Sequence, residues 1–345
     1  MLEPCAAGSI NNQMVTRVNR FLGALCLACC AASAQGQPDF RIGIAGTDSS
    51  HCVAFAKLLN DPANPQHVPG GRIVAAWKGG SPDVEASESR VDGFAAEMSR
   101  TFGVKFYDSI EDLARNVDAL MILSGDGRPH LDEARRAFPF HKPVFIDKPL
   151  GGTLRDGIDI YRLARRLDVP CFSGSSERFS AEMAGLRQAK IGRLMGVFVY
   201  GPATLEPHHP DFFWYGIHAV EKCYTVMGTG CETVVRTHTG DTDVITGVWA
   251  DGRVATVRGN RYMKHEFSTI EFGTDAIVEA RPAEGYGGML TQIIKFYRTG
   301  ISPVSHAETI EILTFMEAAD ESRRRGGAPV SLAEVLKANG GADGI

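Results

Sequence analysis

The sequence lacks the charge imbalance that marks proteins with strongly charged partners. Its 345 residues contain 36 lysines and arginines against 41 acidic residues, and like charges form no long runs. This balance provides no electrostatic attraction for nucleic acid or for an anionic membrane surface. We therefore expect no nucleic-acid partner, and no membrane partner for the mature chain.

Closely spaced cysteine pairs are also missing. Four of the eight cysteines lie within the first 30 residues, and the other four are spread widely without a C-x-x-C motif. These four are Cys52, Cys171, Cys223 and Cys231. Their spacing argues against a structural zinc site and against a disulfide scaffold, so buried thiols are expected. A disulfide bond between Cys223 and Cys231 stays open as an alternative.

The apolar run near the start of the chain is too short to span a membrane. Arg17 and Arg20 precede this run, which closes on the small residues Ala32 to Ala34. A basic segment, a short apolar stretch and small residues at a cleavage site are the three parts of a secretory leader. We predict a signal peptide over residues 1–35 and a periplasmic or secreted protein. A cytoplasmic protein whose start is assigned too early is the alternative.

After the leader, short apolar runs alternate with helical patterns as far as about residue 168. The runs cover residues 41–46, 72–77, 104–108, 118–124 and 143–147. Continuous apolar strands that alternate with helices indicate a parallel sheet covered on both faces. We predict an α/β domain over residues 38–168. Its last helix, which begins at a capping box of Thr153 and Asp156, is expected to link it to a second domain.

The second half has a different pattern. Residues 242–259 form two extended runs joined by Asp251 and Gly252, a strong hairpin signal, and residues 266–273 supply another strand. We predict a second, α+β domain over residues 169–336 with a mainly antiparallel sheet. One face of such a sheet would otherwise be exposed, so we expect a homo-oligomer.

Two motifs follow predicted strands of the first domain, at the edge where open parallel sheets bind ligands. Residues 46–51, GTDSSH, follow the first strand, and residues 147–149, DKP, follow the fifth. Strand side chains alternate in direction, so Asp147 and Lys148 should point to opposite sides. In a crevice, the Lys148 amine can exchange a proton with a hydroxyl group or polarise it. A surface lysine at a strand end is the alternative.

The loop after the first strand keeps only the first glycine of the dinucleotide fingerprint G-x-G-x-x-G. That residue is Gly46, followed by Thr47. Asp48 takes the place of the second glycine and would repel a pyrophosphate unless it caps the following helix. Ser49 and Ser50 can donate hydrogen bonds to an anion at the helix N-terminus. A capped helix start without any ligand stays open.

The preference between NAD and NADP depends on the residues after the second strand. Lys78 comes first and suits a 2′-phosphate, whereas Asp83 would favour the 2′-hydroxyl of NAD. The polar segment 79–93 either folds over the nucleotide or forms a surface loop. Ser124, at the end of the fourth strand, is a further candidate for a cofactor contact.

A histidine-rich segment is the other concentration of reactive groups. Asp211 is expected to begin a helix, and Glu221, three residues after His218, can hold that imidazole and raise its basicity. This spacing predicts an acid–base pair facing a hydroxylated substrate, although a half-buried structural histidine is an alternative. No metal is expected, because the adjacent His208 and His209 point apart in an extended segment and no H-E-x-x-H motif is present.

The order of these motifs resembles the Gfo/Idh/MocA family, which includes glucose–fructose oxidoreductase, inositol dehydrogenase and rhizopine catabolism proteins. The resemblance extends over residues 40–336 and is carried by the strand–glycine opening, by "DALMILSGDGRPHLDEA", by "KPVFIDKPLGGTL" and by the hairpin-rich second half. It implies a Rossmann-type first domain, NAD(P) as cofactor, and hydride transfer to or from a sugar, cyclitol or related polyol.

The resemblance also implies roles for individual residues. The family's glutamate–lysine–proline motif contacts the nicotinamide and assists hydride transfer, and Asp147, Lys148 and Pro149 match it with Asp in place of Glu. On a later helix, the family has an aspartate, three residues and a histidine. His218 matches the histidine, but Trp214 replaces the aspartate and could stack on a sugar ring. The other candidates for substrate binding are Arg178, His208, His209 and Glu221.

Two other functions stay open. The chain could be an enzyme that keeps NAD(P) tightly bound, recycles it within each turnover and performs a redox-assisted elimination or hydrolysis of a sugar derivative. Export favours this alternative, because free nicotinamide cofactors are scarce outside the cytoplasm. It could also be a non-catalytic sugar-binding protein, which the reduced glycine fingerprint and Trp214 would suit.

Overall fold

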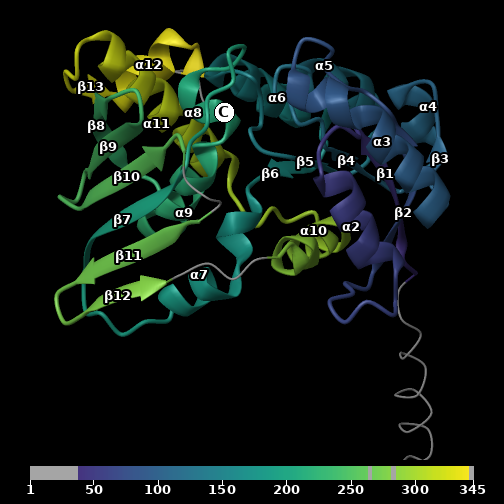
Figure 1. Cartoon of the computed structure of the whole chain (residues 1–345), viewed down its shortest axis with the longest axis horizontal. Helices are drawn as coiled ribbons and strands as arrows, with labels where there is room; N and C mark the ends of the chain where they lie inside the picture. Colours follow the sequence, from purple (N-terminus) through teal and green to yellow (C-terminus); the bar gives the residue numbers. More distant parts are fainter. Residues whose placement is uncertain (1–37, 263–265, 281–284, 342–345) are drawn as a thin grey trace, which may run out of the picture. The chain divides into compact units, whose positions relative to one another are not determined.

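The apolar runs of the first half form one six-stranded parallel sheet (Figure 1). Its strands are β1 (Phe40–Ala45), β2 (Gly71–Trp77), β3 (Lys105–Phe106), β4 (Ala119–Ile122), β5 (Val144–Ile146) and β6 (Cys171–Ser173). Their order is β3-β2-β1-β4-β5-β6, so the winding reverses between β1 and β4. This doubly wound order is that of the Rossmann fold. The predicted fold class of the first half is confirmed.

The computed structural model describes residues 38–262, 266–280 and 285–341. The predicted signal peptide, residues 1–35, lies outside the described residues. Within the described part of the chain, no helix combines the length and the apolar character needed to cross a membrane.

Helices cover both faces of the parallel sheet, as its buried strands require. One face packs against α2 (His51–Asn60), α3 (Glu85–Phe102) and α10 (Gly287–Thr299). The other packs against α4 (Ile110–Arg115), α5 (His130–Ala137) and α6 (Leu154–Leu167), and the short helix η1 (Phe138–Phe140) follows α5. Figure 1 shows α10 beside α2 although it comes from the second half of the chain. The Tyr297 hydroxyl of α10 donates to the carbonyl oxygen of Leu120 at 2.7 Å.

The helix expected to link the two domains has a different place. Its predicted capping box is confirmed, because Thr153 Oγ1 accepts a hydrogen bond from the backbone N–H of Asp156 at 3.1 Å. However, α6 joins β5 to β6, which are neighbours in the same parallel sheet. The parallel sheet therefore continues to Ser173, and the chain enters the second half only after β6.

The second half contains a seven-stranded sheet of order β12-β11-β7-β10-β9-β8-β13. Its strands are β7 (Leu194–Pro202), β8 (Cys231–His238), β9 (Thr242–Trp249), β10 (Val254–Asn260), β11 (Ser268–Gly273), β12 (Ile277–Ala280) and β13 (Val330–Ser331). All pairs are antiparallel except β7 with β10. The predicted hairpin joins β9 to β10, with Gly252 at a φ of 85°. The mainly antiparallel sheet is confirmed.

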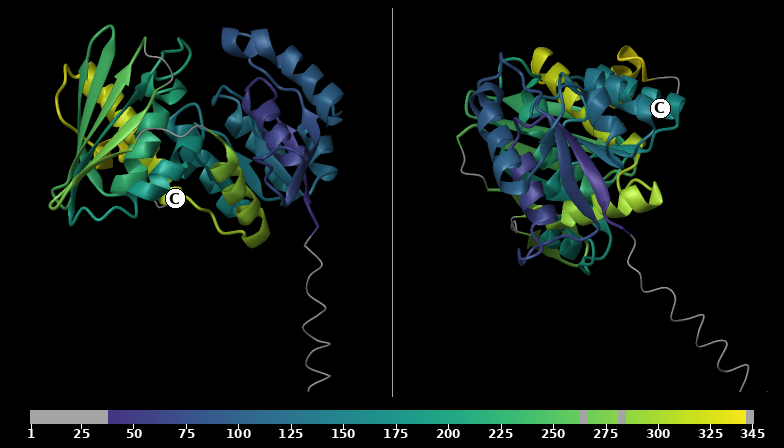
Figure 2. Two further views of the ribbon diagram at one scale, coloured as in Figure 1. Left: turned by 60° about the horizontal axis from the view of Figure 1, so that its bottom comes forward. Right: turned by 90° about the vertical axis from the view of Figure 1, so that its right-hand side faces the viewer.

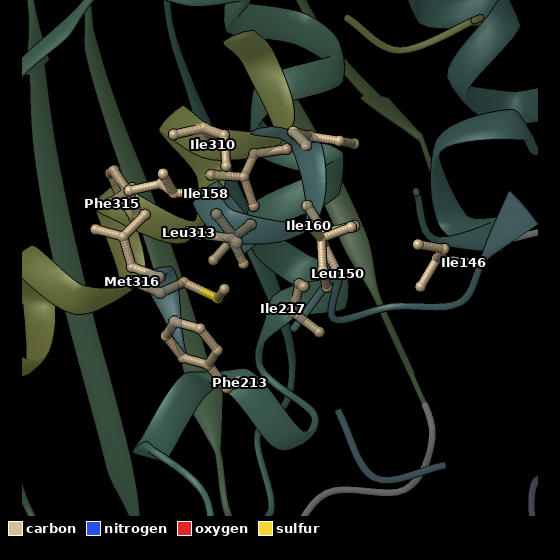
Figure 3. Packing of buried hydrophobic residues seen from close by; sticks show 14 of the residues in the cluster. Ile146, Leu150, Ile158, Ile160, Phe213, Ile217, Ile310, Leu313, Phe315 and Met316 are labelled. Atoms are coloured by element: carbon tan, nitrogen blue, oxygen red, sulfur yellow. The ribbon is translucent and has the colours of Figure 1, made fainter. Parts of the chain in front are cut away.

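Helices pack on one face of this second sheet, and its other face carries none of the described helices (Figure 2). The covering helices include α9 (Ile217–Met227), α11 (His306–Arg324) and α12 (Leu332–Ala338). Shorter elements are η2 (Ser176–Phe179), α7 (Ala181–Leu186) and α8 (Asp211–Trp214). Figure 3 shows Ile158 of α6, Leu313 of α11 and Ile217 of α9 in one buried cluster. The two halves therefore share a continuous hydrophobic core.

The helix expected from Asp211 onward is in fact two helices. Helix α8 ends at Trp214, and α9 begins at Ile217 with Gly216 before it. Gly216 packs against Phe212 so closely that a Cβ atom would lie 2.4 Å from that ring. The Asp211 carboxylate is not a cap, since it lies 2.6 Å from Arg236 Nη2 and also contacts Arg323. This break changes the direction of the chain between Trp214 and His218.

The four cysteines of the described part, Cys52, Cys171, Cys223 and Cys231, are buried free thiols. The alternative of a Cys223–Cys231 disulfide is therefore wrong. Burial raises the pKa of Cys52 and that of Cys231 to about 12, so neither thiol is reactive at neutral pH.

Candidate functional site

A cavity of about 820 Å³ lies at the carboxyl edge of the parallel sheet. Five of the residues predicted from the sequence line it: Ser49, Ser50, Lys148, Trp214 and His218. Its wall combines the start of α2, part of α3, the end of β5, and segments of the second half around α8, α9 and the start of α10. The cavity is thus built from both halves of the chain, as a site for two ligands would require.

Lys148 enters this cavity from the end of β5. Its amine donates to the carbonyl oxygen of Trp214 at 3.4 Å and lies 5.9 Å from the centre of the Tyr215 ring. Burial lowers the pKa of Lys148, and the charge of Asp147 opposes that shift. The amine can therefore lose its proton more easily than a surface lysine.

Asp147 points to the other side, as strand alternation predicts. Its side chain is buried, with Oδ2 only 2.5 Å from His51 Nδ1 and Oδ1 accepting the backbone N–H of Lys148 at 2.8 Å. Burial favours the neutral acid, but the His51 interaction outweighs it and keeps the pKa of Asp147 below its usual value. The Asp147 side chain does not line the cavity, whereas His51 does.

The loop after β1 is closed by internal contacts. Gly46 has a φ of +87°, and a Cβ atom there would lie 2.3 Å from Ser124 Oγ, so only glycine fits. Thr47 is buried, and both its backbone N–H and its hydroxyl donate to the carbonyl oxygen of Lys78, at 2.8 and 3.1 Å. Gly46 and Thr47 therefore shape the loop without lining the cavity.

Asp48 does not cap α2, which was the condition under which it would not repel a pyrophosphate. The N-cap residue of α2 is Ser50, and the buried Asp48 carboxylate accepts the Ser87 hydroxyl at 2.5 Å and the Gly125 backbone N–H at 3.0 Å. Ser87 belongs to α3, which forms most of the polar segment expected to be a loop or a cover. The charge of Asp48 is thus satisfied by protein donors and directed away from the cavity.

Two further candidates for the cofactor lie outside the cavity lining. Lys78 is exposed, and its amine lies 2.6 Å from the carboxylate of Asp92. Ser124 is buried and donates to Glu133 Oε1 at 2.6 Å. A contact between Lys78 and a 2′-phosphate stays a prediction, since the amine lies beside Asp92 and outside the cavity lining.

The predicted pairing of His218 with Glu221 is also wrong. The His218 Nδ1 atom lies 2.7 Å from the Ser175 hydroxyl, whereas Glu221 Oε2 lies 2.6 Å from Arg178 Nη1. Arg178 is buried and contacts Glu308 as well. Burial raises the pKa of Glu221, and Arg178 opposes that shift. Arg178 of η2 and Glu221 of α9 therefore form a structural ion pair. Of the residues Arg178, His218 and Glu221, only His218 lines the cavity.

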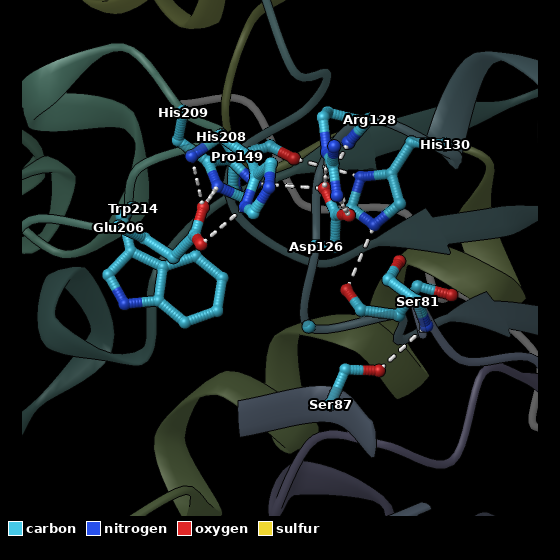
Figure 4. A network of polar contacts seen from close by, with 12 residues as sticks. Ser81, Ser87, Asp126, Arg128, His130, Pro149, Glu206, His208, His209 and Trp214 are labelled. Atoms are coloured by element: carbon cyan, nitrogen blue, oxygen red, sulfur yellow. Dashed lines mark hydrogen bonds and ion pairs between the residues drawn. The ribbon is translucent and has the colours of Figure 1, made fainter. Parts of the chain in front are cut away.

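His208 and His209, expected as substrate contacts, belong to a polar network next to the cavity (Figure 4). The His209 ring is buried, its Nε2 lies 2.8 Å from Asp126 Oδ1, and its Nδ1 contacts Glu206. His208 Nδ1 lies 2.8 Å from the other oxygen of Glu206. The network joins the loop after β4 to the segment before α8, so it fixes the two halves of the wall.

The loops after β4 and β5 are joined in a similar way. Arg128 binds Asp126 and Asp83, and the buried His130 ring lies 3.0 Å from the Ser124 carbonyl oxygen and 2.9 Å from that of Pro149. Pro149, the last residue of the DKP motif, thus has its carbonyl group held from α5. These contacts position Lys148 by fixing the loop that follows it.

The sequence reasoning missed several residues of the wall, of which the main ones are His51, Arg90, Tyr215 and Tyr286. His51 stands where the fingerprint has its third glycine, and that departure was the available signal. Burial raises the pKa of Tyr215 to about 12, so its hydroxyl stays protonated at neutral pH. Among the described residues, no group of three or more histidines, cysteines or acids is arranged to hold a metal ion.

Comparison with known proteins finds a family model that matches the first half of the chain. A family model described as "Oxidoreductase family, NAD-binding Rossmann fold" matches residues 40–175. Among curated proteins, no match is found. Many solved structures match in fold, and three of them illustrate the range.

The first is a probable dehydrogenase from Thermotoga maritima, 20% identical, with a TM-score of 0.69 over 86% of this chain and 99% of that one. The second is myo-inositol 2-dehydrogenase from Lactobacillus plantarum, 17% identical, with a TM-score of 0.69 over 85% and 99%. The third is myo-inositol dehydrogenase from Lactobacillus casei in complex with NAD(H) and myo-inositol, 16% identical, with a TM-score of 0.66 over 85% and 97%.

At these identities the structural likeness establishes the fold alone, and the family model supports the resemblance over residues 40–175. Over residues 40–175, the chain therefore matches the Gfo/Idh/MocA model of an oxidoreductase family with an NAD-binding Rossmann fold.

Proposed function

We propose that the protein is an NAD(P)-dependent oxidoreductase that transfers hydride to or from a sugar, cyclitol or related polyol. The observation that carries this proposal is the position of Lys148, whose amine enters a large cavity at the carboxyl end of β5 with a lowered pKa. The fold and the family model support it. So does the myo-inositol complex of the Lactobacillus casei enzyme, which shares the fold of this chain.

The residues around the cavity fit a dinucleotide despite the reduced fingerprint. Ser49 and Ser50 line the cavity at the start of α2, and the Arg90 side chain of α3 lines it nearby. Asp48 should not repel the pyrophosphate of the cofactor, because its carboxylate is buried and bound by Ser87 and Gly125. Ser49, Ser50 and Arg90 would therefore hold the phosphates.

When bound, the nicotinamide ring supplies the hydride acceptor or donor. In the oxidation direction, the carbinol C–H bond breaks with its electron pair, and the hydroxyl proton goes to the neutral amine of Lys148. Burial lowers the pKa of Lys148 and so favours the neutral amine, which suits this task. His218, held by Ser175, assists at the substrate oxygen, and the Trp214 side of the wall faces the sugar ring.

The proposal predicts that nucleotide can be recovered or added. We would denature freshly purified protein and analyse the supernatant by mass spectrometry, then assay a panel of sugars and cyclitols with NAD⁺ and NADP⁺. Reduction of either coenzyme by a polyol supports the proposal. Sugar binding by calorimetry with no nucleotide binding at any concentration would instead support a non-catalytic sugar-binding protein.

We also propose that the chain forms a homo-oligomer through the open face of the second sheet. Five large apolar side chains are exposed on or next to its strands: Met195, Val248, Val254, Tyr262 and Ile277. Tyr262, just after β10, is 86% exposed. Light scattering would test this, and Val248→Lys should shift the protein toward monomer; a monomeric wild type would exclude it.

Export through the leader of residues 1–35 is proposed on the sequence pattern alone. Expression of the full chain in a Gram-negative host, followed by N-terminal mass spectrometry of the periplasmic fraction, tests it. A shortened N-terminus near Gln35 in the periplasm supports export. An intact chain that stays in the cytoplasm would support the alternative of a start assigned too early.

A further inference from the structure

His51 is the residue of the cavity wall whose contacts are least expected from its position in the fingerprint. It replaces the third glycine, which normally allows close packing of helix on strand. Here an imidazole extends from the start of α2, across β4, to the carboxylate of Asp147 at the end of β5. The side chains of His51 and Asp147 thus connect the GTDSSH and DKP motifs. Each of these residues departs from the residue that the corresponding family motif has at its position.

The His51 ring is held in place from both sides. It stacks on Phe55 with ring centres 5.1 Å apart and meets the edge of Tyr286 at 4.9 Å. With only 11% of its side chain exposed, the ring has little room to turn away from Asp147. The contact between Nδ1 and Oδ2 is therefore a fixed part of the site.

Both oxygens of Asp147 are occupied by these contacts. Oδ2 is bound to His51, and Oδ1 accepts the backbone N–H of Lys148 at 2.8 Å. The amine of Lys148, one residue further on, lies against the Trp214 carbonyl oxygen instead. Strand alternation directs the Asp147 side chain away from that amine, and the His51 contact holds the carboxylate there.

The other titratable groups of the described wall do not take over that role. They are Arg90 of α3, Glu177 of η2, Tyr215, His218 of α9 and Tyr286 before α10. Glu177 is the single acid in the described lining, and its Oε2 already lies 3.0 Å from the Lys222 amine. Burial lowers the pKa of Lys148, and Asp147 is the acid whose charge opposes that shift.

We propose that His51 is a positioning residue for Lys148: by binding Asp147 Oδ2, it prevents an ion pair between that carboxylate and the Lys148 amine. This inference rests on the proposed function in one respect: a neutral Lys148 amine is useful only if the protein transfers hydride. The contacts of His51 and Asp147 do not depend on any reaction. Without His51, Asp147 Oδ2 would be free to attract the amine, and the pKa of Lys148 would rise.

The test measures the titration of Lys148 without substrate or cofactor. Protein at a series of pH values is labelled briefly with an amine-reactive anhydride, digested with trypsin and analysed by tandem mass spectrometry. Lys142 and Lys148 lie between Arg136 and Arg155, so one tryptic peptide carries both lysines. Lys142, at the other end of β5, is the internal reference.

Four variants give distinct expectations. His51→Ala should move the labelling midpoint of Lys148 to higher pH, Asp147→Asn should move it to lower pH, and the double variant should match Asp147→Asn. His51→Asn, which keeps a neutral donor, should fall between wild type and His51→Ala. Circular dichroism establishes whether each variant is folded. If His51→Ala is not folded, His51→Asn still tests the proposal.

The proposal is overturned if His51→Ala leaves the midpoint unchanged, lowers it, or shifts it equally in the Asp147→Asn background. Failure of the proposed function would look different. Wild-type protein that oxidises no polyol would still give a labelling midpoint for Lys148. Whether that midpoint depends on His51 is decided by the labelling experiment alone.

Discussion

Three cations, two buried and one in the cavity wall, have very different surroundings. Arg236, in the second sheet, is fully buried among three carboxylates, those of Asp211, Asp243 and Asp320. The buried His209 lies between two, and Lys148 of the cavity touches a carbonyl oxygen while its neighbouring acid is bound elsewhere. A cation surrounded by acids holds the structure, whereas one kept apart from acids is available for proton transfer.

The largest effect should come from Lys148. Lys148→Met removes the amine from the cavity and should lower turnover at least about 100-fold, because general acid–base groups contribute that much or more. Nucleotide affinity and the unfolding free energy should change little, since no acid loses a partner. Steady-state kinetics with calorimetry measure both effects. Lys142→Met, at the other end of the same strand, is the matched control, and equal losses in the two variants would contradict the assignment.

The same kind of exchange at Arg236 should act on stability instead. Arg236→Met removes the cation that three buried or partly buried carboxylates share, although Asp211 keeps Arg323 and Asp243 keeps Arg261, and it should cost about 3–5 kcal/mol of unfolding free energy. Chemical denaturation measures this change. Arg193→Met, an exposed arginine just before β7, should change stability by less than about 0.5 kcal/mol. If Arg236→Met is as stable as wild type, Arg236 does not hold the structure, and the contrast drawn between Arg236 and Lys148 is wrong.

His209 is a buried cation whose charge depends on pH. Although burial favours the neutral ring, hydrogen bonds to Asp126 and Glu206 raise the pKa of His209 above 6.5. The stability from its protonation is present below the ordinary pKa and should be lost as pH rises through the raised value. Denaturation curves at several pH values should therefore show a loss of about 1–3 kcal/mol that His209→Phe abolishes.

The acids of the same network should lower the stability at low pH, whereas His209 lowers it at high pH. Interactions with His209 and Arg128 outweigh burial and lower the pKa of Asp126, and Glu206 is likewise lowered by His208 and His209. Their contribution is present above the ordinary carboxyl pKa and is lost as pH falls through the lowered values. His208→Phe, at the exposed neighbour, should change the profile by less than about 1 kcal/mol. A His209→Phe profile identical to that of wild type would show that the network does not stabilise the fold.

The smallest effect is expected for an exposed cation. Lys78→Met breaks a surface ion pair with Asp92 and should change stability by less than about 1 kcal/mol. Because the Lys78 amine is outside the cavity lining, the ratio of the affinities for NAD⁺ and NADP⁺ should also stay the same. Calorimetry with both coenzymes measures this ratio. A loss of NADP⁺ affinity alone would restore the role first inferred for Lys78.

Local patterns were sufficient for most elements of the fold. Thr153 with Asp156 begins α6 as predicted, because a cap is made by residues close in sequence. The Asp251–Gly252 turn likewise set the β9–β10 hairpin. The break between α8 and α9 escaped prediction, since it depends on how tightly Gly216 packs against Phe212.

The sequence by itself determined the parallel and antiparallel halves of this protein and the lysine at the end of β5, because strand periodicity, turn residues and strand-end motifs are local signals. Only the tertiary structure decided which charges meet: Ser175 with His218, Arg178 with Glu221, and His51 with Asp147 across 96 positions of the chain. Such pairings depend on the distances between elements after folding, and spacing along one helix or strand cannot specify them.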